Sequence, residues 1–327
     1  MNTSPHEMLI AAWFGMLCVM LVFYVVTDGF DLGTGIISLA IRKEGERSLL
    51  FQSIAHVWDA NETWLVVLGG ALFGAFPAAY ALIMGGLYVP ISAMIFGFIL
   101  RGASIEFRHA AHWKPGWDLL FGLGSLLVAL AQGWVLGRII TGMSADAMSL
   151  AFTAATSIGV ACGYTLLGAT YLVRKTGGPL ASRARKLALV AVIATVAAAI
   201  VASAGTLLVS PLGRDRWDHP GVFHALLALG SIAALSFVFV LLTLVKGSTT
   251  KPFLGSVVMF LASLGGLAVS IYPNVVPGRL TLAEAASGES TLIFMLFGVG
   301  ILMPVMLGYN IYQYMAFRGV IQPAKAP

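Results

Sequence analysis

The feature that most constrains this chain is a series of long apolar runs. A helix rises about 1.5 Å per residue, so about 20 apolar residues are needed to cross about 30 Å of hydrocarbon. Of the 327 residues, 59% are hydrophobic and only 10% are charged, whereas a soluble domain carries roughly a quarter charged residues. The sequence therefore predicts an all-α integral membrane protein with about nine transmembrane helices. The expected helices cover residues 8–41, 53–73, 78–100, 117–138, 148–173, 186–209, 221–245, 252–272 and 290–316.

The segments between these runs are short. None is long enough for an extramembrane domain, so residues 1–327 are expected to form one polytopic membrane domain. The first run is longer than one crossing requires, and Thr27-Asp28-Gly29-Phe30-Asp31-Leu32-Gly33 interrupts its apolar character. Either this helix extends beyond the membrane or its glycines bend it.

Lys and Arg are distributed unevenly over the loops. If the N-terminus lies outside, fifteen of the 19 fall on inner segments, and only Arg138, Arg214, Arg216 and Arg279 fall on outer loops. Cytoplasmic loops carry the excess of basic residues in membrane proteins, so an N-out, C-in orientation is predicted. The net charge of +5 has the same origin. Because the basic residues form short clusters and no continuous stripe, nucleic acid is not an expected partner.

The second expected helix holds the densest group of ionisable side chains. Such residues are costly inside a membrane and commonly mark functional sites. His56, Asp59 and Glu62 are spaced three apart, so they are expected to form a ladder on one helix face. An imidazole and two carboxylates in a line can pass protons, since burial and mutual interaction shift their protonation. The alternative is that the acids pair with Arg101 or Arg108 and lock the helices together.

Haem ligands are scarce in this sequence. Axial ligation needs His, Met or Cys facing a cavity, and only His56 lies clearly within an expected span. A His/carboxylate metal centre is disfavoured as well, because such a centre uses two Glu-x-x-His motifs and the chain does not have two. The chain is therefore expected to ligate no haem and no metal.

Four segments together resemble subunit II of the bd-type quinol oxidases of bacterial respiratory chains. They are Thr27-Asp28-Gly29-Phe30-Asp31-Leu32-Gly33, Trp58-Asp59-Ala60-Asn61-Glu62-Thr63-Trp64-Leu65-Val66, Gly69-Gly70-Ala71-Leu72-Phe73-Gly74-Ala75-Phe76-Pro77, and Arg101-Gly102 followed by Glu106-Phe107-Arg108. They occur in the family's order over roughly the first third of the chain, and the remainder is similar in hydropathy and helix number. The short loops and the last segment look most like the cyanide-insensitive branch.

This resemblance implies a fold of two four-helix bundles plus one peripheral helix, paired with a homologous subunit I. In the family, subunit I carries two b-type haems and one haem d, or a b-type variant, and the external site that oxidises membrane quinol. The complex reduces O2 to water in the bacterial inner (cytoplasmic) membrane and separates charge without pumping. The chain itself is expected to be haem-free and not catalytic alone, with its N-terminus periplasmic and its C-terminus cytoplasmic. A small single-helix accessory subunit, phospholipid and a structural quinone are further expected partners.

The resemblance also assigns roles to residues. Asp59 matches the family's proton-route aspartate, Glu106 an acid at the inner entrance, and Trp58 and Arg101 their neighbours. The expected proton pathway thus comprises Asp59, Glu106, Trp58, Arg101, Glu62 and His56, and the expected motif or structural residues are Asp28, Asp31 and Asn61. One departure is Ala55-His56-Val57, where the family often has proline before the Trp-Asp pair.

Two other classes of function compete with this interpretation. A proton-coupled secondary transporter could use Asp28, Asp31, Asp59 and Glu62 as its coupling site. Such transporters often show interrupted helices in two matching halves, whereas the acids here cluster in the first third of the chain. The other rival is a purely structural partner without a proton role, which composition alone does not distinguish.

Overall fold

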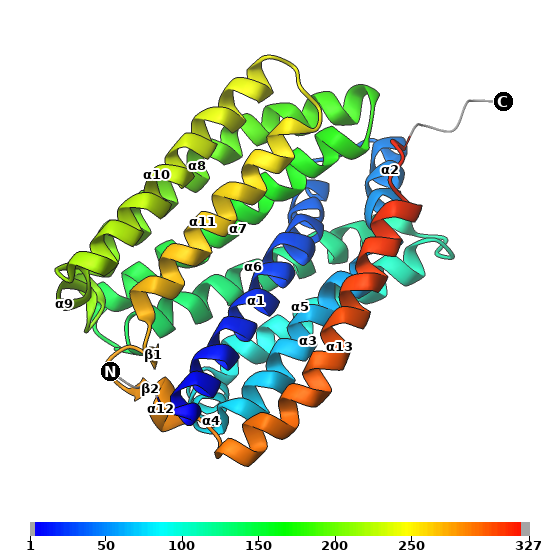
Figure 1. Ribbon diagram of the computed structural model, residues 1–327. Helices are drawn as coiled ribbons and strands as arrows, with labels where there is room; N and C mark the ends of the chain where they lie inside the picture. Colours follow the sequence, from blue (N-terminus) through cyan, green and yellow to red (C-terminus); the bar gives the residue numbers. More distant parts are fainter. Residues whose placement is uncertain (1–3, 322–327) are drawn as a thin grey trace.

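The computed structural model describes residues 4–321, without the side chains of residues 214 and 215. Lys325 and the side chain of Arg214, both used in the expected orientation, lie outside this part. The described chain is almost entirely helical, and its long helices run side by side (Figure 1). They are α1 (Pro5–Ser38), α3 (Trp58–Ala75), α5 (Tyr88–Arg108), α6 (Lys114–Ile140), α7 (Ala147–Lys175), α8 (Gly178–Val209), α10 (Pro220–Val245), α11 (Lys251–Ile271) and α13 (Glu289–Ala316).

Short elements occupy the two ends of this helix pack. They are α2 (Glu44–Ile54), α4 (Pro77–Gly86), α9 (Gly213–Trp217), α12 (Leu282–Ala285) and the antiparallel strands β1 (Asn274–Val276) and β2 (Leu280–Thr281). α4, α12 and the two strands lie at the end where α1 begins, and α2 lies at the opposite end beside the last turn of α13 (Figure 1).

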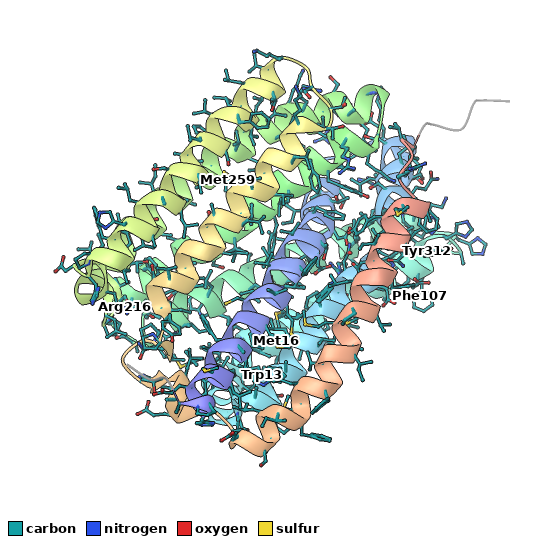
Figure 2. All side chains as sticks on the ribbon, viewed as in Figure 1. Trp13, Met16, Phe107, Arg216, Met259 and Tyr312 are labelled. Atoms are coloured by element: carbon teal, nitrogen blue, oxygen red, sulfur yellow. The ribbon has the colours of Figure 1, made fainter. Side chains whose placement is uncertain are left out.

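Eight of the described helices are long and apolar enough to cross a membrane. A ninth candidate is the pair α3 and α4, in which the chain bends by 120° between the two helices. Large apolar side chains project outward along the helices (Figure 2), among them Phe107 at 59% exposed and Tyr312 at 68% exposed. The prediction of an all-α protein with about nine candidate spans is confirmed, and the chain is a multi-pass membrane protein.

The second and third expected helices have different boundaries in the structure. The run 53–73 includes the end of α2 and a turn at residues 55–57, and α3 begins only at Trp58. The run 78–100 joins α4 to the first half of α5, since the break near Leu87 lies between apolar residues and leaves no signal in hydropathy. Arg101 and Arg108, expected in an inner loop, therefore lie within α5. The first expected helix is one continuous helix, since α1 runs without interruption to Ser38.

α1 occupies the centre of the helix pack. It contacts α3, α6 and α7, while α5 packs on α6, α8 on α7, and α10 on α11. α13 packs against α3 and α1, and the indole Nε1 of Trp13 on α1 donates to the carbonyl of Leu292 at 3.1 Å. A helix at this position can carry polar groups that never meet lipid.

Glycine permits the close approach of α1 and α7. A Cβ on Gly33 would collide with the backbone of Tyr164, and one on Gly168 would collide with the backbone of Gly33. Small residues let backbones of membrane helices come together. The glycines of the segment 27–35 therefore serve packing, and the two acids of the same segment remain available for other contacts.

Asp146 fixes the start of α7 outside the spans. Its carboxylate accepts hydrogen bonds from the Ser144 hydroxyl at 2.6 Å and from the Ser149 backbone N–H at 2.9 Å. These donors stabilise the charged form, and they lower the pKa of Asp146.

Candidate functional site

Arg101 forms the centre of a buried ion cluster between α1, α3 and α5. Its Nη1 lies 2.6 Å from Asp28 Oδ1, and its Nη2 lies 2.7 Å from Glu62 Oε2. The side chains of Arg101 and Asp28 are both 0% exposed, and that of Glu62 is 24% exposed. One guanidinium therefore bridges a fully buried acid on α1 and a partly accessible acid on α3.

Asp31 lies one turn after Asp28 and receives a different set of partners. The amide Nδ2 of Asn61 donates to Asp31 Oδ2 at 2.7 Å, and the hydroxyl of Tyr314 on α13 donates to Asn61 Oδ1 at 2.8 Å. Asp31 and Asn61 are both fully buried. A line of hydrogen bonds thus leads from the last turns of α13 through α3 to the acid on α1.

Three more polar groups continue from the cluster along α1, α6 and α7. The Gln132 amide donates to the Tyr24 hydroxyl, and the Tyr164 hydroxyl donates to Gln132 Oε1 at 2.6 Å. Tyr24 lies one turn before Asp28, so this group extends the buried polar region toward the start of α1. No periodic or motif signal in the sequence marks this group.

Asp59 and Glu62 open onto a groove of about 900 Å³ between α3, α4 and α5. We call it the acidic groove, and its lining includes Trp58, Asp59, Glu62, Phe73, Phe98 and Gly102. Asp59 is exposed in the described chain, and the guanidinium of Arg101 lies 6.0 Å from the Trp58 ring. Most of the remaining lining is apolar, so the two carboxylates form the polar end of an otherwise apolar surface.

A second ion cluster joins α2, α5 and α6 at their shared end. Arg108 Nε lies 2.5 Å from Asp118 Oδ1, and Arg47 Nη1 lies 3.0 Å from Asp118 Oδ2. Arg108 also pairs with Glu44 at 3.0 Å. Glu106 lies nearby on α5, is exposed, and makes no hydrogen bond or ion pair with the described residues.

His56 does not join a ladder with Asp59 and Glu62. It lies in the turn before α3, where its ring stacks on Phe317 at 4.3 Å. It lines a separate pocket of about 380 Å³, here called the C-terminal pocket, together with Ser53, Tyr171, Lys175, Tyr314 and Phe317. The expected helical spacing fails because α3 starts two residues after His56. Asp59 and Glu62 both line the acidic groove.

Sequence reasoning missed several members of the site. Tyr314 lies far from the acids in sequence, and only the packing of α13 on α3 brings it to Asn61. Asp118 could have been suspected as an acid at the start of a span. The alternative in which acids pair with arginines describes part of the structure, since Asp28 and Glu62 pair with Arg101.

These contacts give the helix pack a distinctive chemistry. Buried carboxylates and phenols of this kind can take up or release protons, because the protonation of each depends on its neighbours and here on one guanidinium. The described residues contain no group of three or more His, Cys, Asp or Glu side chains placed to hold a metal ion. The fold and the site define a multi-pass membrane protein with ionisable groups in its interior.

Comparison with known proteins agrees with this class and narrows it. The chain belongs to the family "Cytochrome bd terminal oxidase subunit II", whose model matches residues 9–317. It is therefore a subunit of a quinol:oxygen oxidoreductase. The resemblance inferred from the four sequence segments is confirmed at the level of the family.

Several relatives match nearly the whole chain. Cytochrome bd ubiquinol oxidase subunit 2 of Bacillus subtilis (strain 168) is 29% identical, with 96% of each chain covered. Cytochrome bd-I ubiquinol oxidase subunit 2 of Escherichia coli (strain K12) is 27% identical, over 97% of this chain and 96% of the relative. The solved bd oxidase of Geobacillus thermodenitrificans contains a chain that superposes with a TM-score of 0.74 at 18% identity, over 95% of this chain and 99% of that one. This last comparison shows that the two chains share a fold.

Proposed function

We propose that this chain is the haem-free subunit of a bd-type terminal oxidase, which oxidises membrane quinol and reduces O2 to water, and that it supplies a proton-uptake route. The observation that carries the proposal is the acidic groove, in which Asp59 and Glu62 stand beside the buried Arg101. Asp59 is the relay, and Glu106 collects protons from water at the same end of α5. Arg101 tunes the route because its ion pair with Glu62 at 2.7 Å favours the charged form of that carboxylate.

The described residues of this chain do not fit haem, which the family implies for the complex. Axial ligation needs a His, Met or Cys facing a cavity. None of the six histidines has a buried side chain. His56 lines the C-terminal pocket, but its ring is stacked on Phe317. Met20, at 0% exposed, is packed in the apolar core. We therefore assign the haems to a homologous partner, subunit I, which forms a heterodimer with this chain.

The partner is expected to cover the acidic groove. Val66 and Phe73 on α3 are 69% and 61% exposed, and Ile95 and Ile99 on α5 are 52% and 60% exposed. This apolar face lies beside two carboxylates that would be costly to leave against lipid. A haem-bearing subunit seated here would place its proton-consuming site within reach of Asp59. Phospholipid, a structural quinone and a small accessory subunit belong to the same proposed assembly.

The arrangement in the membrane is part of the proposal. Contacts of α7 with α8 and α11, of α10 with α11, and of α1 with α3 and α6 support two four-helix bundles with α13 outside them. The basic residues support an N-out, C-in orientation in the bacterial inner membrane, with the whole chain acting as one membrane domain. Quinol protons would then leave outside while protons for water enter from inside, which separates charge without a pump.

Oxygen consumption by the purified complex tests the relay. Replacing Asp59 by Asn removes the titratable group and preserves its size, so assembly and haem content should be unchanged while turnover falls about hundredfold. Asp218→Asn, an exposed acid in the loop before α10, is the matched control and should keep full turnover. Normal turnover in Asp59→Asn, with the complex intact, would refute the relay assignment.

A further inference from the structure

Two buried carboxylate oxygens lack partners among the described residues. They are Asp28 Oδ2 and Asp31 Oδ1, and both side chains are 0% exposed. Buried polar atoms are nearly always hydrogen-bonded, so each unpaired one calls for an explanation. The two acids are three residues apart on α1, which places them on one helix face. One proton taken up by the pair would remove one buried charge and turn one of these oxygens into a hydroxyl donor.

The charges of the cluster support the same conclusion independently. Asp28, Asp31 and Glu62 surround one cation, Arg101. If all three acids were ionised, two negative charges would remain unbalanced in a region shielded from water. Burying an unpaired charge has a large cost in desolvation free energy. Buried carboxylates without a countercharge therefore usually take up a proton. Two carboxyl groups sharing a site cannot both ionise easily.

Among the described residues, the groups that face the two acids supply no second cation. Arg101 already pairs with Asp28 and Glu62, and Asn61 and the nearby phenols contribute neutral dipoles. α11 presents the apolar Phe253. The phenols are Tyr24 on α1, Tyr164 and Tyr171 on α7 and Tyr314 on α13. Tyr24 lies close enough to interact with Asp28, but a phenol hydrogen bond leaves the total charge unchanged.

We propose that Asp28 and Asp31 together hold one proton, and that this proton reaches them from the C-terminal pocket. A hydronium ion gives its proton to Asp31 Oδ1, where an O–H bond forms, and a water molecule remains. Tyr314 lines the pocket and donates to Asn61, which donates to the other oxygen of Asp31. Passing a proton through the Asn61 amide would require an imidic acid, so Tyr314 and Asn61 are positioning residues that hold Asp31 in place.

The C-terminal pocket, as the proposed proton inlet, is separate from the acidic groove. The C-terminal pocket lies between α7, the turn before α3 and the end of α13, whereas the groove lies between α3, α4 and α5. The segment after α13 borders the pocket, and the backbone N–H of Ile321 donates to the Lys175 carbonyl at 2.9 Å. The held proton gives the complex a store beside the relay. Only this use in turnover rests on the proposed function, since the proton itself can be observed in the resting complex.

Infrared difference spectroscopy of the purified resting complex tests the proposal. The C=O stretch of a protonated carboxyl group should be present in the wild type at neutral pH, should shift in D2O, and should be lost in Asp31→Asn. Asp28→Asn should also remove or shift it, which provides a second variant if Asp31→Asn fails to assemble. Asp59→Asn should retain the band, so loss of the relay and loss of the held proton are distinguishable.

The rate at which the band shifts in D2O tests the inlet. Tyr314→Phe should retain the band but slow its exchange by about tenfold, the order of one net hydrogen bond. Tyr312→Phe is the matched control and should exchange like the wild type, because Tyr312 is 68% exposed on the same helix (Figure 2). Equal exchange rates in the two variants would overturn the inlet.

Two other results would overturn the held proton. One is the absence of the carboxyl band from the wild type, or its persistence in both Asp28→Asn and Asp31→Asn. The other is a band that appears only when Na+ is removed. That result would mean that a cation balances the acids with help from Thr34 Oγ1, which is also buried and unpaired in the described chain.

Discussion

Arg101 and Asp28 form an ion pair from which water is excluded on both sides. The two side chains are 0% exposed, and Nη1 lies 2.6 Å from Oδ1. The pair ties α5 to α1, and the second Arg101 contact ties α5 to α3 through Glu62. Three helices therefore share one guanidinium, and the proposed proton chemistry takes place around it.

Removing Arg101 should destabilise the chain severely. Arg101→Leu leaves Asp28 buried without its countercharge, which costs about 3–5 kcal/mol. We expect loss of assembled complex or a large drop in its thermal unfolding temperature, measured by fluorescence-detected size exclusion after heating. Arg318→Leu, an exposed residue after α13, should unfold like the wild type. The unfolding temperature of Arg101→Lys should lie between those of these two variants, because a lysine ammonium does not reproduce the guanidinium's contacts with two carboxylates. An Arg101→Leu complex as stable as the control would contradict this account.

Glu106→Gln should slow oxygen consumption by up to about tenfold, less than Asp59→Asn. Glu106 is exposed and has no partner among the described residues, so its proposed part is to attract protons electrostatically, and such focusing is screened by salt. The rates of variant and wild type should therefore differ at low ionic strength and converge at high ionic strength. Glu289→Gln at the opposite end of the helix pack provides the control. If Glu106→Gln remained equally slow at low and high ionic strength, Glu106 would have another role.

Gly33→Leu should prevent correct packing of α1 on α7. Its side chain would have to occupy the space of the Tyr164 backbone, and overpacking costs about 1–3 kcal/mol or more when the backbone cannot move. Gly15→Leu on the same helix is the matched control, since nothing lies within 4 Å of a Cβ there. The yield of complex after detergent extraction distinguishes the two. Equal yields would show that the close approach is dispensable.

Labelling of single cysteines tests the orientation. With Cys18 and Cys162 replaced by Ala, Asp218→Cys before α10 should react with a membrane-impermeant maleimide in spheroplasts. Thr249→Cys before α11 should react only after lysis. Both residues are exposed, so access to the reagent depends on the side of the membrane alone. The opposite pattern would reverse the assigned orientation.

Hydropathy predicted most of the helices because burial in lipid dictates composition directly. The expected ends of the helices from residue 117 onward lie close to the observed ends of α6, α7, α10, α11 and α13. The α4–α5 boundary was missed because Leu87 and its neighbours are as apolar as the helices on either side. Hydropathy measures transfer to lipid, and it contains no information on where a chain bends within an apolar stretch.

The candidate site was predictable only where its members are close in sequence. Asp59 and Glu62 share the acidic groove because they are three residues apart on one helix. The pairing of Arg101 with Asp28, 73 residues away, depends on how α5 and α1 pack. Tyr314 reaches Asn61 across 253 residues, and no local pattern marks such a contact. His56 was misplaced because helical spacing was applied across a turn.

The angle between α3 and α4 has a consequence for the surrounding bilayer. α3 has 18 residues, which gives a length of about 27 Å, a little less than about 30 Å of hydrocarbon. Its first turns carry Asp59 and Glu62, so its apolar part is shorter still. Hydrophobic mismatch of this kind is relieved by local thinning of the membrane. Headgroups and water would then dip toward α3, and an acid inside the nominal hydrocarbon slab would remain wet at the one place where protons are proposed to enter.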